Sequence, residues 1–263
     1  KAENVKNLPN GYYQQMLGGK NLDWIRCYAE GKYTYVQEGR PVWPEYDDNL
    51  MSSEAIEYDP QLPIHIGLDF GLTPAAAIGQ KLANGRWIIL HEIVTEDMGL
   101  ERFGTQLLAE INAKFPSSQV LVWGDPAGMQ RDAIYEVTAF DYLRTLGLRA
   151  QPTASNNFQV RREGAAAPMQ RLIAGKPGLI IHRSCKRLRK SLSGGYHFKR
   201  IAIGAGHERF KDSPNKNEHS HIGDAFGYLM LGGGEHKRMT KNNLNANTLI
   251  SQTVVNTEFD VFS

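Results

Sequence analysis

The stretch Ile64-His65-Ile66-Gly67-Leu68-Asp69-Phe70-Gly71 decides the fold, because it reads as a buried strand that ends in a carboxylate. Two further strand-like runs follow at residues 75–82 and 86–94, and Ala83-Asn84-Gly85 between them is a hairpin signal. Three consecutive strands predict an antiparallel meander that begins with this stretch.

Helices and strands alternate after the meander. Val120-Leu121-Val122-Trp123-Gly124 reads as a second buried strand and leads directly into Asp125. Crossover helices between strands imply parallel pairing beside the meander, so the sequence predicts an α/β fold: a ribonuclease-H-like mixed sheet flanked by helices. The other expected elements are helices at 99–114, 139–146, 155–174, 185–193 and 218–231, strands at 148–150 and 179–182, and a hairpin at 194–210.

The bulk composition fits a soluble globular chain. Its 263 residues can bury one core with an appendage, and the net charge is only +2. Cys27 and Cys185 show neither zinc spacing nor a disulfide framework, and no apolar run is long enough to span a membrane. The chain begins Lys1-Ala2-Glu3 without a signal peptide, so we expect a fragment or a processed product of a longer protein.

Positive charge concentrates between residues 183 and 211, where Glu208 is the one acidic residue. Aromatic and apolar residues are interleaved with the basic ones, which favours a face that binds a polyanion over an ordinary solvated surface. The candidate DNA-binding residues are Lys186, Arg187, Arg189, Lys190, Lys199, Arg200, Arg209 and Lys211.

Three aspartates carry the candidate chemistry. Asp69 and Asp125 each end a buried strand, and Asp224 lies on the last expected helix. If the two strands are neighbours in the sheet, their carboxylates converge and repel each other, which a divalent cation would relieve. Oxygen donors of this kind suit Mg²⁺ or Mn²⁺, and two such ions about 3.5–4 Å apart would hydrolyse a phosphodiester bond without a side-chain nucleophile.

Each residue also has a purely structural interpretation. Asp69 could cap a turn at its strand end, and Asp125 could be the N-cap of the segment from Met129. His221 lies three residues before Asp224 and so shares its helix face. It could be a satisfied core histidine, a metal ligand or a proton shuttle.

The residues resemble a known family. Gly67-Leu68-Asp69-Phe70-Gly71, Gly124-Asp125-Pro126-Ala127-Gly128 and His221-Ile222-Gly223-Asp224-Ala225 are similar to the C-terminal nuclease domain of the large terminase subunit of tailed bacteriophages. Upstream, Pro9-Asn10-Gly11-Tyr12-Tyr13 and Pro41-Val42-Trp43-Pro44 resemble the connector that leaves the terminase motor domain.

This resemblance implies a metal-dependent endonuclease that cuts concatemeric double-stranded viral DNA during packaging. It implies that Asp69, Asp125 and Asp224 bind the catalytic metals, two Mg²⁺ or Mn²⁺ ions, and that His221 contributes to catalysis. The implied partners are double-stranded DNA, the portal protein and the small terminase subunit, with no membrane. The implied location is the host cell cytoplasm, at the viral procapsid.

The resemblance also sets the expected domain organisation. Residues 1–60 would be the connector from an absent ATPase motor domain, 61–234 the nuclease domain and 235–263 a flexible C-terminal tail. The motor's phosphate-cradling G-x-x-x-x-G-K-[ST] loop does not occur in this sequence, and Gly18-Gly19-Lys20 is not one. This chain should therefore cut DNA without translocating it.

Two rival functions remain open at the level of sequence. Asp69-Phe70-Gly71-Leu72-Thr73 matches the phosphate-binding hairpin of actin-like ATPases and sugar kinases, although that fold needs a second domain for which this chain is too short. A non-catalytic DNA-binding assembly module that uses only the basic face is the other rival.

Overall fold

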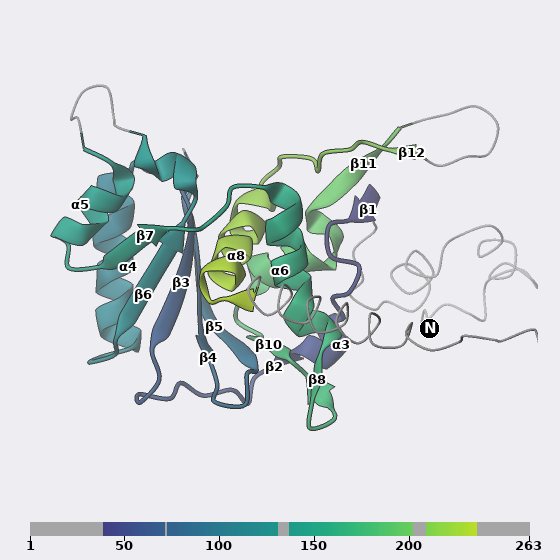
Figure 1. Ribbon diagram of the computed structural model, residues 1–263, viewed down its shortest axis with the longest axis horizontal. Helices are drawn as coiled ribbons and strands as arrows, with labels where there is room; N and C mark the ends of the chain where they lie inside the picture. The colour runs from purple at the N-terminus through teal and green to yellow at the C-terminus, as the bar shows by residue number, and fades with distance from the viewer. Residues whose placement is uncertain (1–38, 72, 131–136, 202–208, 236–263) are drawn as a thin grey trace, which may run out of the picture.

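The computed structural model describes residues 39–71, 73–130, 137–201 and 209–235 (Figure 1). A mixed sheet of seven strands lies at its centre, in the order β2-β10-β5-β4-β3-β6-β7. These strands are β2 (Ser52–Ser53), β3 (Ile64–Asp69), β4 (Ala75–Lys81), β5 (Trp87–Val94), β6 (Val120–Gly124), β7 (Arg149–Pro152) and β10 (Leu179–His182).

The strands β3, β4 and β5 form the antiparallel meander expected from the sequence, and β6 pairs in parallel with β3. The remaining pairs, β6 with β7, β5 with β10 and β10 with β2, are also parallel. Within this sheet, therefore, β4 alone runs against the others. The carboxyl ends of the other six strands meet at one edge, which we call the carboxyl edge.

Helices cover both faces of the sheet, which confirms the expected α/β architecture (Figure 1). The helices α4 (Leu100–Lys114) and α5 (Ala139–Thr145) lie on one face, and α6 (Phe158–Gln170) and α8 (Ser220–Gly232) lie on the other. The short elements are α3 (Asp48–Met51), α7 (Lys186–Lys190), a 3-10 turn η3 (Pro126–Met129) and a wide turn η4 (Ser191–Gly195).

Alternation along β3 assigns its side chains to the two faces. Ile64, Ile66 and Leu68 are buried in the core beneath α4 and α5. His65 and Asp69 point to the opposite face, where His65 stacks on Trp123 and meets Trp87 edge-on. The strand thus presents Asp69 to the side of the sheet that α8 covers.

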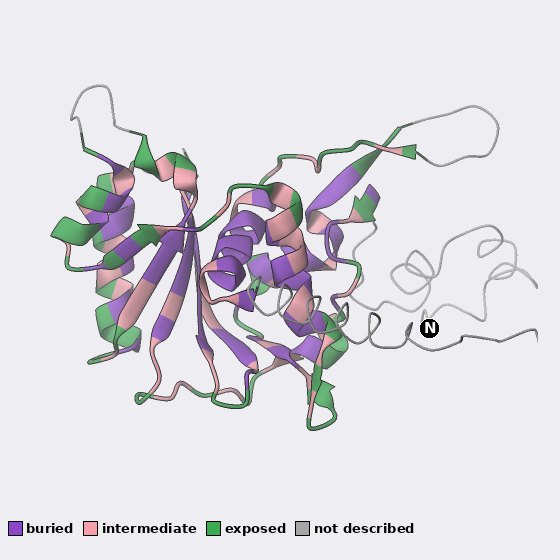
Figure 2. Cartoon of the chain, viewed as in Figure 1, coloured by how far each residue is buried: buried purple, intermediate pink, exposed green. Residues whose placement is uncertain are grey.

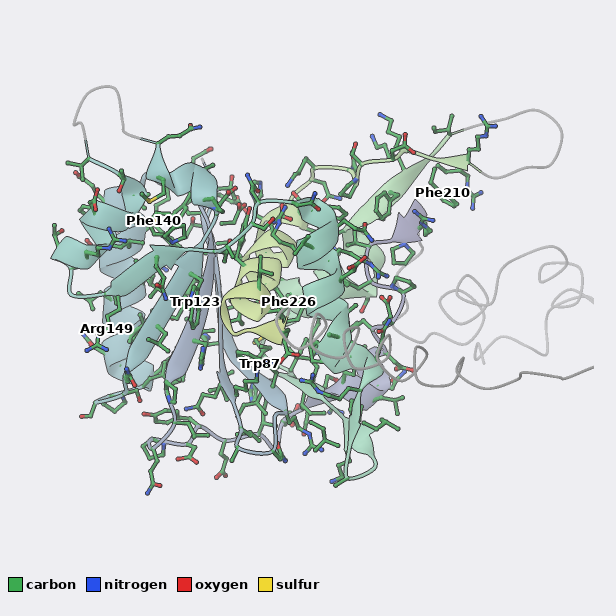
Figure 3. All side chains as sticks on the ribbon, in the orientation of Figure 1. Trp87, Trp123, Phe140, Arg149, Phe210 and Phe226 are labelled. Atoms are coloured by element: carbon green, nitrogen blue, oxygen red, sulfur yellow. The ribbon has the colours of Figure 1, made fainter. Side chains whose placement is uncertain are left out.

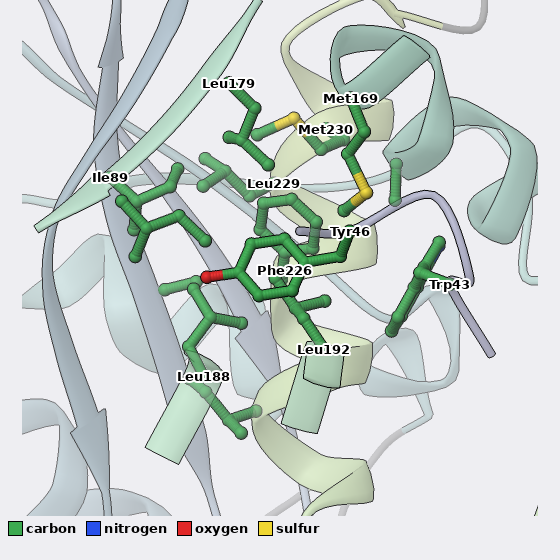
Figure 4. Packing of buried hydrophobic residues seen from close by; sticks show 14 of the residues in the cluster. Trp43, Tyr46, Ile89, Met169, Leu179, Leu188, Leu192, Phe226, Leu229 and Met230 are labelled. Carbon is green, nitrogen blue, oxygen red and sulfur yellow. The ribbon is translucent and has the colours of Figure 1, made fainter. Parts of the chain in front are cut away.

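Two apolar cores hold the layers together (Figure 2). Phe140 belongs to the core on the α4 and α5 side, and Phe226 belongs to the core beneath α8 (Figure 3). In the second core, Phe226 and Leu229 of α8 pack among Leu188, Leu192 and other buried residues (Figure 4). This packing fixes the position of α8 against the sheet.

The described part of the expected connector packs on the sheet domain: Val42, Trp43, Tyr46 and Met51 belong to this second core, and Tyr58 packs against the first. The strand β1 (Gly39–Pro41) pairs with β11 (His197–Ile201), which in turn pairs with β12 (Arg209–Phe210). Trp43 is buried, and its ring nitrogen donates to the Arg162 carbonyl at 3.0 Å. Residues 1–38 and 236–263, which hold most of the expected connector and tail, lie outside the described residues.

Two expected elements end earlier than the sequence suggested. The helix expected to reach residue 174 stops at Gln170, because Ala174 and Gly175 turn with φ values of 50° and 72° between β8 (Leu172–Ile173) and β9 (Lys176–Pro177). The basic helix expected over 185–193 ends at Lys190, where η4 begins, and Gly194 adopts a φ of 110°.

Glu235 anchors the end of α8 to the sheet. Its buried carboxylate accepts hydrogen bonds from Trp87 Nε1 at 2.9 Å and Arg171 Nη1 at 2.8 Å, and pairs with Lys81 Nζ at 2.9 Å. Burial alone would raise the pKa of this carboxyl, but the three donors outweigh it and lower the pKa to about 2. Trp87 begins β5 and Lys81 ends the reversed β4, so this anchor lies at the edge opposite the carboxyl edge.

Among the helices that the structure describes, none has the length and apolar character that crossing a bilayer requires.

Candidate active site

The sheet brings two of the predicted aspartates to neighbouring positions. Leu68 of β3 is paired with Gly124 of the parallel strand β6. Asp69 directly follows Leu68 and Asp125 directly follows Gly124, so both aspartates lie at the carboxyl edge. The two strands are therefore neighbours in the sheet, which is the condition under which the sequence predicts that their carboxylates converge.

A close approach of α8 to β3 adds the third aspartate. A Cβ atom built on Gly67 would lie 2.1 Å from the Ala225 carbonyl oxygen and 2.4 Å from the Leu229 nitrogen. The backbones of the helix and strand therefore touch at a position that admits no side chain. Asp224 precedes Ala225 and His221 lies one turn earlier, so both reach the end of β3.

His221 contacts Asp69 directly. The distance from His221 Nδ1 to Asp69 Oδ2 is 2.9 Å. This hydrogen bond is the largest cause that raises the pKa of His221, and the charge of Asp69 adds to it. The protonated imidazolium is therefore favoured beside the carboxylate.

Asp69 is largely buried, with 14% of its side chain exposed. Its contacts do not fully offset the effect of this burial on its pKa. Burial raises its pKa; the hydrogen bond from His221 opposes this, and the nearby charge of Asp224 raises the pKa further. Two carboxylates from distant parts of the chain thus repel each other at this edge. An additional positive charge would relieve that repulsion.

Asp224 is the most enclosed of the three, with 4% of its side chain exposed. Its Oδ1 accepts from Arg161 Nη1 at 3.1 Å and from the Tyr196 hydroxyl at 3.3 Å, while its Oδ2 pairs with Lys216 Nζ. The sequence interpretation missed Arg161, Tyr196 and Lys216. Nothing in their local sequence distinguishes them, because they meet Asp224 only through the packing of α6, η4 and the loop before α8.

Asp125 is an N-cap, as the sequence allowed, but the turn that it caps ends at Met129 and does not begin there. Its Oδ1 accepts from Ala127 N at 2.9 Å and so caps η3. The Tyr228 hydroxyl of α8 donates to Asn156 Oδ1 at 3.1 Å, and its pKa is raised chiefly by burial and further by the negative charge of Asp125. Capping occupies one face of one oxygen and leaves further lone pairs on the carboxylate.

The oxygen atoms of the three aspartates are the kind of ligand that a hard divalent cation prefers. Asp69, Asp125 and Asp224 supply carboxylate oxygens, the ligands that Mg²⁺ and Mn²⁺ prefer. In the described residues, no three His, Cys, Asp or Glu side chains are already gathered closely enough to hold a metal ion. Instead, two side-chain cations, Arg161 and Lys216, pair with Asp224.

The candidate DNA-binding residues differ in exposure and in their contacts. The helix α7 follows β10, which is parallel to β5, so its basic side chains start from the carboxyl edge. Arg189 makes two hydrogen bonds to Asp48, at 2.8 and 2.6 Å, and Arg187 pairs with Glu96 at 3.5 Å. Lys190 is half-buried; the exposed candidates are Lys186, Arg187, Lys199, Arg200, Arg209 and Lys211.

Comparison with known proteins identifies the fold. No protein-family model matches the chain, and neither does any curated protein. The solved large terminase of a thermophilic bacteriophage, in complex with ADP, matches 86% of this chain with a TM-score of 0.55 and 15% identity. The nuclease domain of the P22 large terminase matches 73% of this chain with a TM-score of 0.52 and 10% identity, and 93% of that domain is covered.

The chain thus has the fold of a large-terminase nuclease domain, and the ribonuclease-H-like fold expected from the sequence is confirmed. The match covers 52% of the thermophilic phage's large terminase, so the chain spans about half of that protein's length. At these identities the likeness concerns the fold, and the site must be argued from its own residues.

Proposed function

We propose that this chain is a metal-dependent endonuclease that hydrolyses phosphodiester bonds of double-stranded DNA. The observation that carries the proposal is the placement of Asp69, Asp125 and Asp224 toward the carboxyl edge of this fold, where His221 is hydrogen-bonded to Asp69. Nuclease activity would account for the repulsion between Asp69 and Asp224 and for the exposed basic residues between positions 183 and 211.

The roles of the residues follow from their contacts. Two Mg²⁺ or Mn²⁺ ions, when bound, would supply an activated water and stabilise the leaving 3′ oxygen. Asp69, Asp125 and Asp224 would hold these ions, and His221 fixes the orientation of the Asp69 carboxylate through its Nδ1 atom. Arg161 does the same for Asp224 through Oδ1.

The biological setting that we propose is viral genome packaging. The chain would be the nuclease part of a packaging terminase that cuts concatemeric DNA at the procapsid in the host cytoplasm. The portal protein and the small terminase subunit would be its protein partners. In this proposal residues 1–60 lead from a motor domain, 61–234 form the nuclease and 235–263 form a tail. Support comes from the sequence resemblance and from the fold of the thermophilic-phage and P22 terminases.

Digestion of supercoiled plasmid tests the catalytic proposal directly. We expect nicked and linear products with Mg²⁺ or Mn²⁺ and none with EDTA, because the site supplies no nucleophile of its own. Intact plasmid with either metal, at protein concentrations that shift the DNA in a gel, would instead favour the non-catalytic assembly module. Calorimetric titration with ATP should give no saturable heat, whereas saturable binding would favour the ATPase alternative.

The salt dependence of DNA binding tests whether the exposed basic residues contact DNA phosphates. Lys186, the first residue of α7, and Lys199, on β11, are exposed basic residues. Changing both to Gln should lower the slope of log K against log salt by about 2, since each phosphate contact contributes roughly one unit. The measurement is fluorescence anisotropy with duplex DNA from about 50 to 200 mM salt in EDTA.

The matched control for this titration is Lys176→Gln, since Lys176 is an exposed lysine on β9. The strand β9 immediately precedes β10, so Lys176 lies toward the edge opposite the site. Its slope should equal that of the unmodified chain. Equal slopes for the double variant and the unmodified chain would contradict phosphate contacts by Lys186 and Lys199.

A further inference from the structure

Asp224 carries a different cation on each of its oxygens. Arg161 donates to Oδ1 and Lys216 pairs with Oδ2. The two cations differ sharply in exposure: 8% of the Arg161 side chain is exposed, compared with 67% of the Lys216 side chain. One counter-charge of this carboxylate is therefore built into the core, while the other stands at the surface.

Arg161 is held in place by its surroundings. Its guanidinium lies over the ring of Tyr228, 4.4 Å from the ring centre, and 5.9 Å from the ring centre of Phe158. Leaving Asp224 would strand a buried cation among aromatic rings, which is strongly unfavourable. Arg161 is thus a permanent partner of Asp224.

Lys216 can leave by a side-chain movement alone. Its backbone is fixed on both sides, because Asn215 N donates to the His197 carbonyl at 2.8 Å and Asn217 Nδ2 donates to the Gly195 carbonyl at 2.9 Å. The ammonium stands at the end of a flexible four-carbon stem and is readily hydrated. Rotation of that stem moves the charge into solvent without disturbing the loop.

We propose that Lys216 is an exchangeable counter-cation: it neutralises Asp224 while the site holds no metal, and it gives up that oxygen when a divalent ion binds. This inference rests on the proposed metal-dependent function. It explains how buried carboxylates from β3 and α8 stay assembled without an ion, since Lys216 offsets the repulsion between Asp69 and Asp224. It also gives Lys216 a positioning role rather than a catalytic one, because its contact is with Asp224.

Competition between Lys216 and the ion has a measurable consequence. An ion that must displace an ammonium binds more weakly than one that meets a vacant oxygen. Exposed ion pairs are worth up to about 1 kcal/mol, which converts to roughly fivefold in affinity. Lys216→Met keeps the length of the stem and removes the charge, so this variant should bind Mn²⁺ roughly fivefold more tightly than the unmodified chain.

The experiment is calorimetric titration of Mn²⁺ into the metal-free chain, without DNA and at fixed ionic strength. Lys216→Arg restores the charge and should restore the weaker affinity. Lys176→Met removes an exposed charge at the opposite edge and should leave the affinity unchanged. Asp69→Asn identifies which part of the heat belongs to this site. As a second measurement, the rise in thermal midpoint on adding Mn²⁺ should be larger for Lys216→Met than for the unmodified chain.

The outcomes separate this inference from the function on which it rests. Asp69-dependent Mn²⁺ binding with the same affinity in Lys216→Met and in the unmodified chain would overturn the exchange and leave the nuclease proposal standing. No Asp69-dependent binding in either protein would overturn both. Tighter binding in Lys216→Met that Lys216→Arg also shows would overturn the role of the charge.

Discussion

Asp69→Asn should lower plasmid cleavage by about a thousandfold or more, while the folded protein becomes no less stable. Loss of an oxygen ligand to an ion that stabilises the transition state by several kcal/mol corresponds to a rate effect of this size. The thermal midpoint should stay level or rise, because the amide has no charge to bury. An activity loss without a stability loss is the signature expected of a residue retained for function.

The pKa of Asp69 determines whether Asp69→Asn raises or lowers the free energy of unfolding at a given pH. The pKa of Asp69 is raised in the folded protein, chiefly by burial. A carboxyl with a raised folded pKa binds its proton more tightly in the native state, so its ionisation destabilises the fold as the pH rises above 3.8, its ordinary value. Asp69→Asn should remove this contribution, and unfolding in urea at about pH 4 and about pH 7 measures it.

Two further variants complete the test. Asp141→Asn changes an exposed carboxylate on α5 and should cleave at the unmodified rate. Asp224→Asn should lose cleavage and also stability, because Arg161 then lies buried without its charged partner. If Asp69→Asn keeps more than about a tenth of the rate, the assignment of Asp69 as a ligand is wrong.

Gly67→Ala should cause the second large effect, a fall of roughly 10 °C in the thermal midpoint together with loss of cleavage. The added methyl group would stand 2.1 Å from the Ala225 carbonyl oxygen and 2.4 Å from the Leu229 nitrogen, and backbone cannot move aside as a side chain can. Overpacking of this kind costs about 3 kcal/mol, and each kcal/mol lowers the midpoint of a domain of this size by about 2–4 °C.

Cleavage should fall with stability in this variant, because α8 carries both His221 and Asp224 and the methyl group pushes it off β3. The matched control is Gly99→Ala, since a Cβ atom at Gly99 meets nothing within 4 Å. Differential scanning fluorimetry and plasmid digestion measure the two effects. A midpoint for Gly67→Ala within about 2 °C of the Gly99→Ala value would show that the close contact does not position α8.

Much of the fold could be predicted because its signals are local. The run from Ile64 to Asp69 and the run before Asp125 are apolar and short, and a turn signal separates the next two strands. Their order along the chain restricts the sheet to few topologies, and the observed one places Asp69 beside Asp125. The convergence of these two carboxylates was therefore accessible from sequence.

The partners of the site residues were not accessible, because they depend on contacts between distant segments. Arg161 and Asp224 are separated by 63 residues, and no pattern around Arg161 distinguishes it from Arg162, which pairs with Glu45. Arg189 illustrates the same limit among the basic residues. Composition marks it as a DNA contact, yet its guanidinium holds Asp48, 141 residues away.

The tether of Glu235 to Trp87 and Arg171 gives the two tips of the last helix different tasks. One tip carries His221 and Asp224, while the other is fastened to the far rim of the sheet; Asp224 lies about 12 Å from Gly232, the last helical residue, at roughly 1.5 Å per residue. The polypeptide that continues past Glu235 therefore leaves the sheet from the rim opposite Asp69 and Asp125.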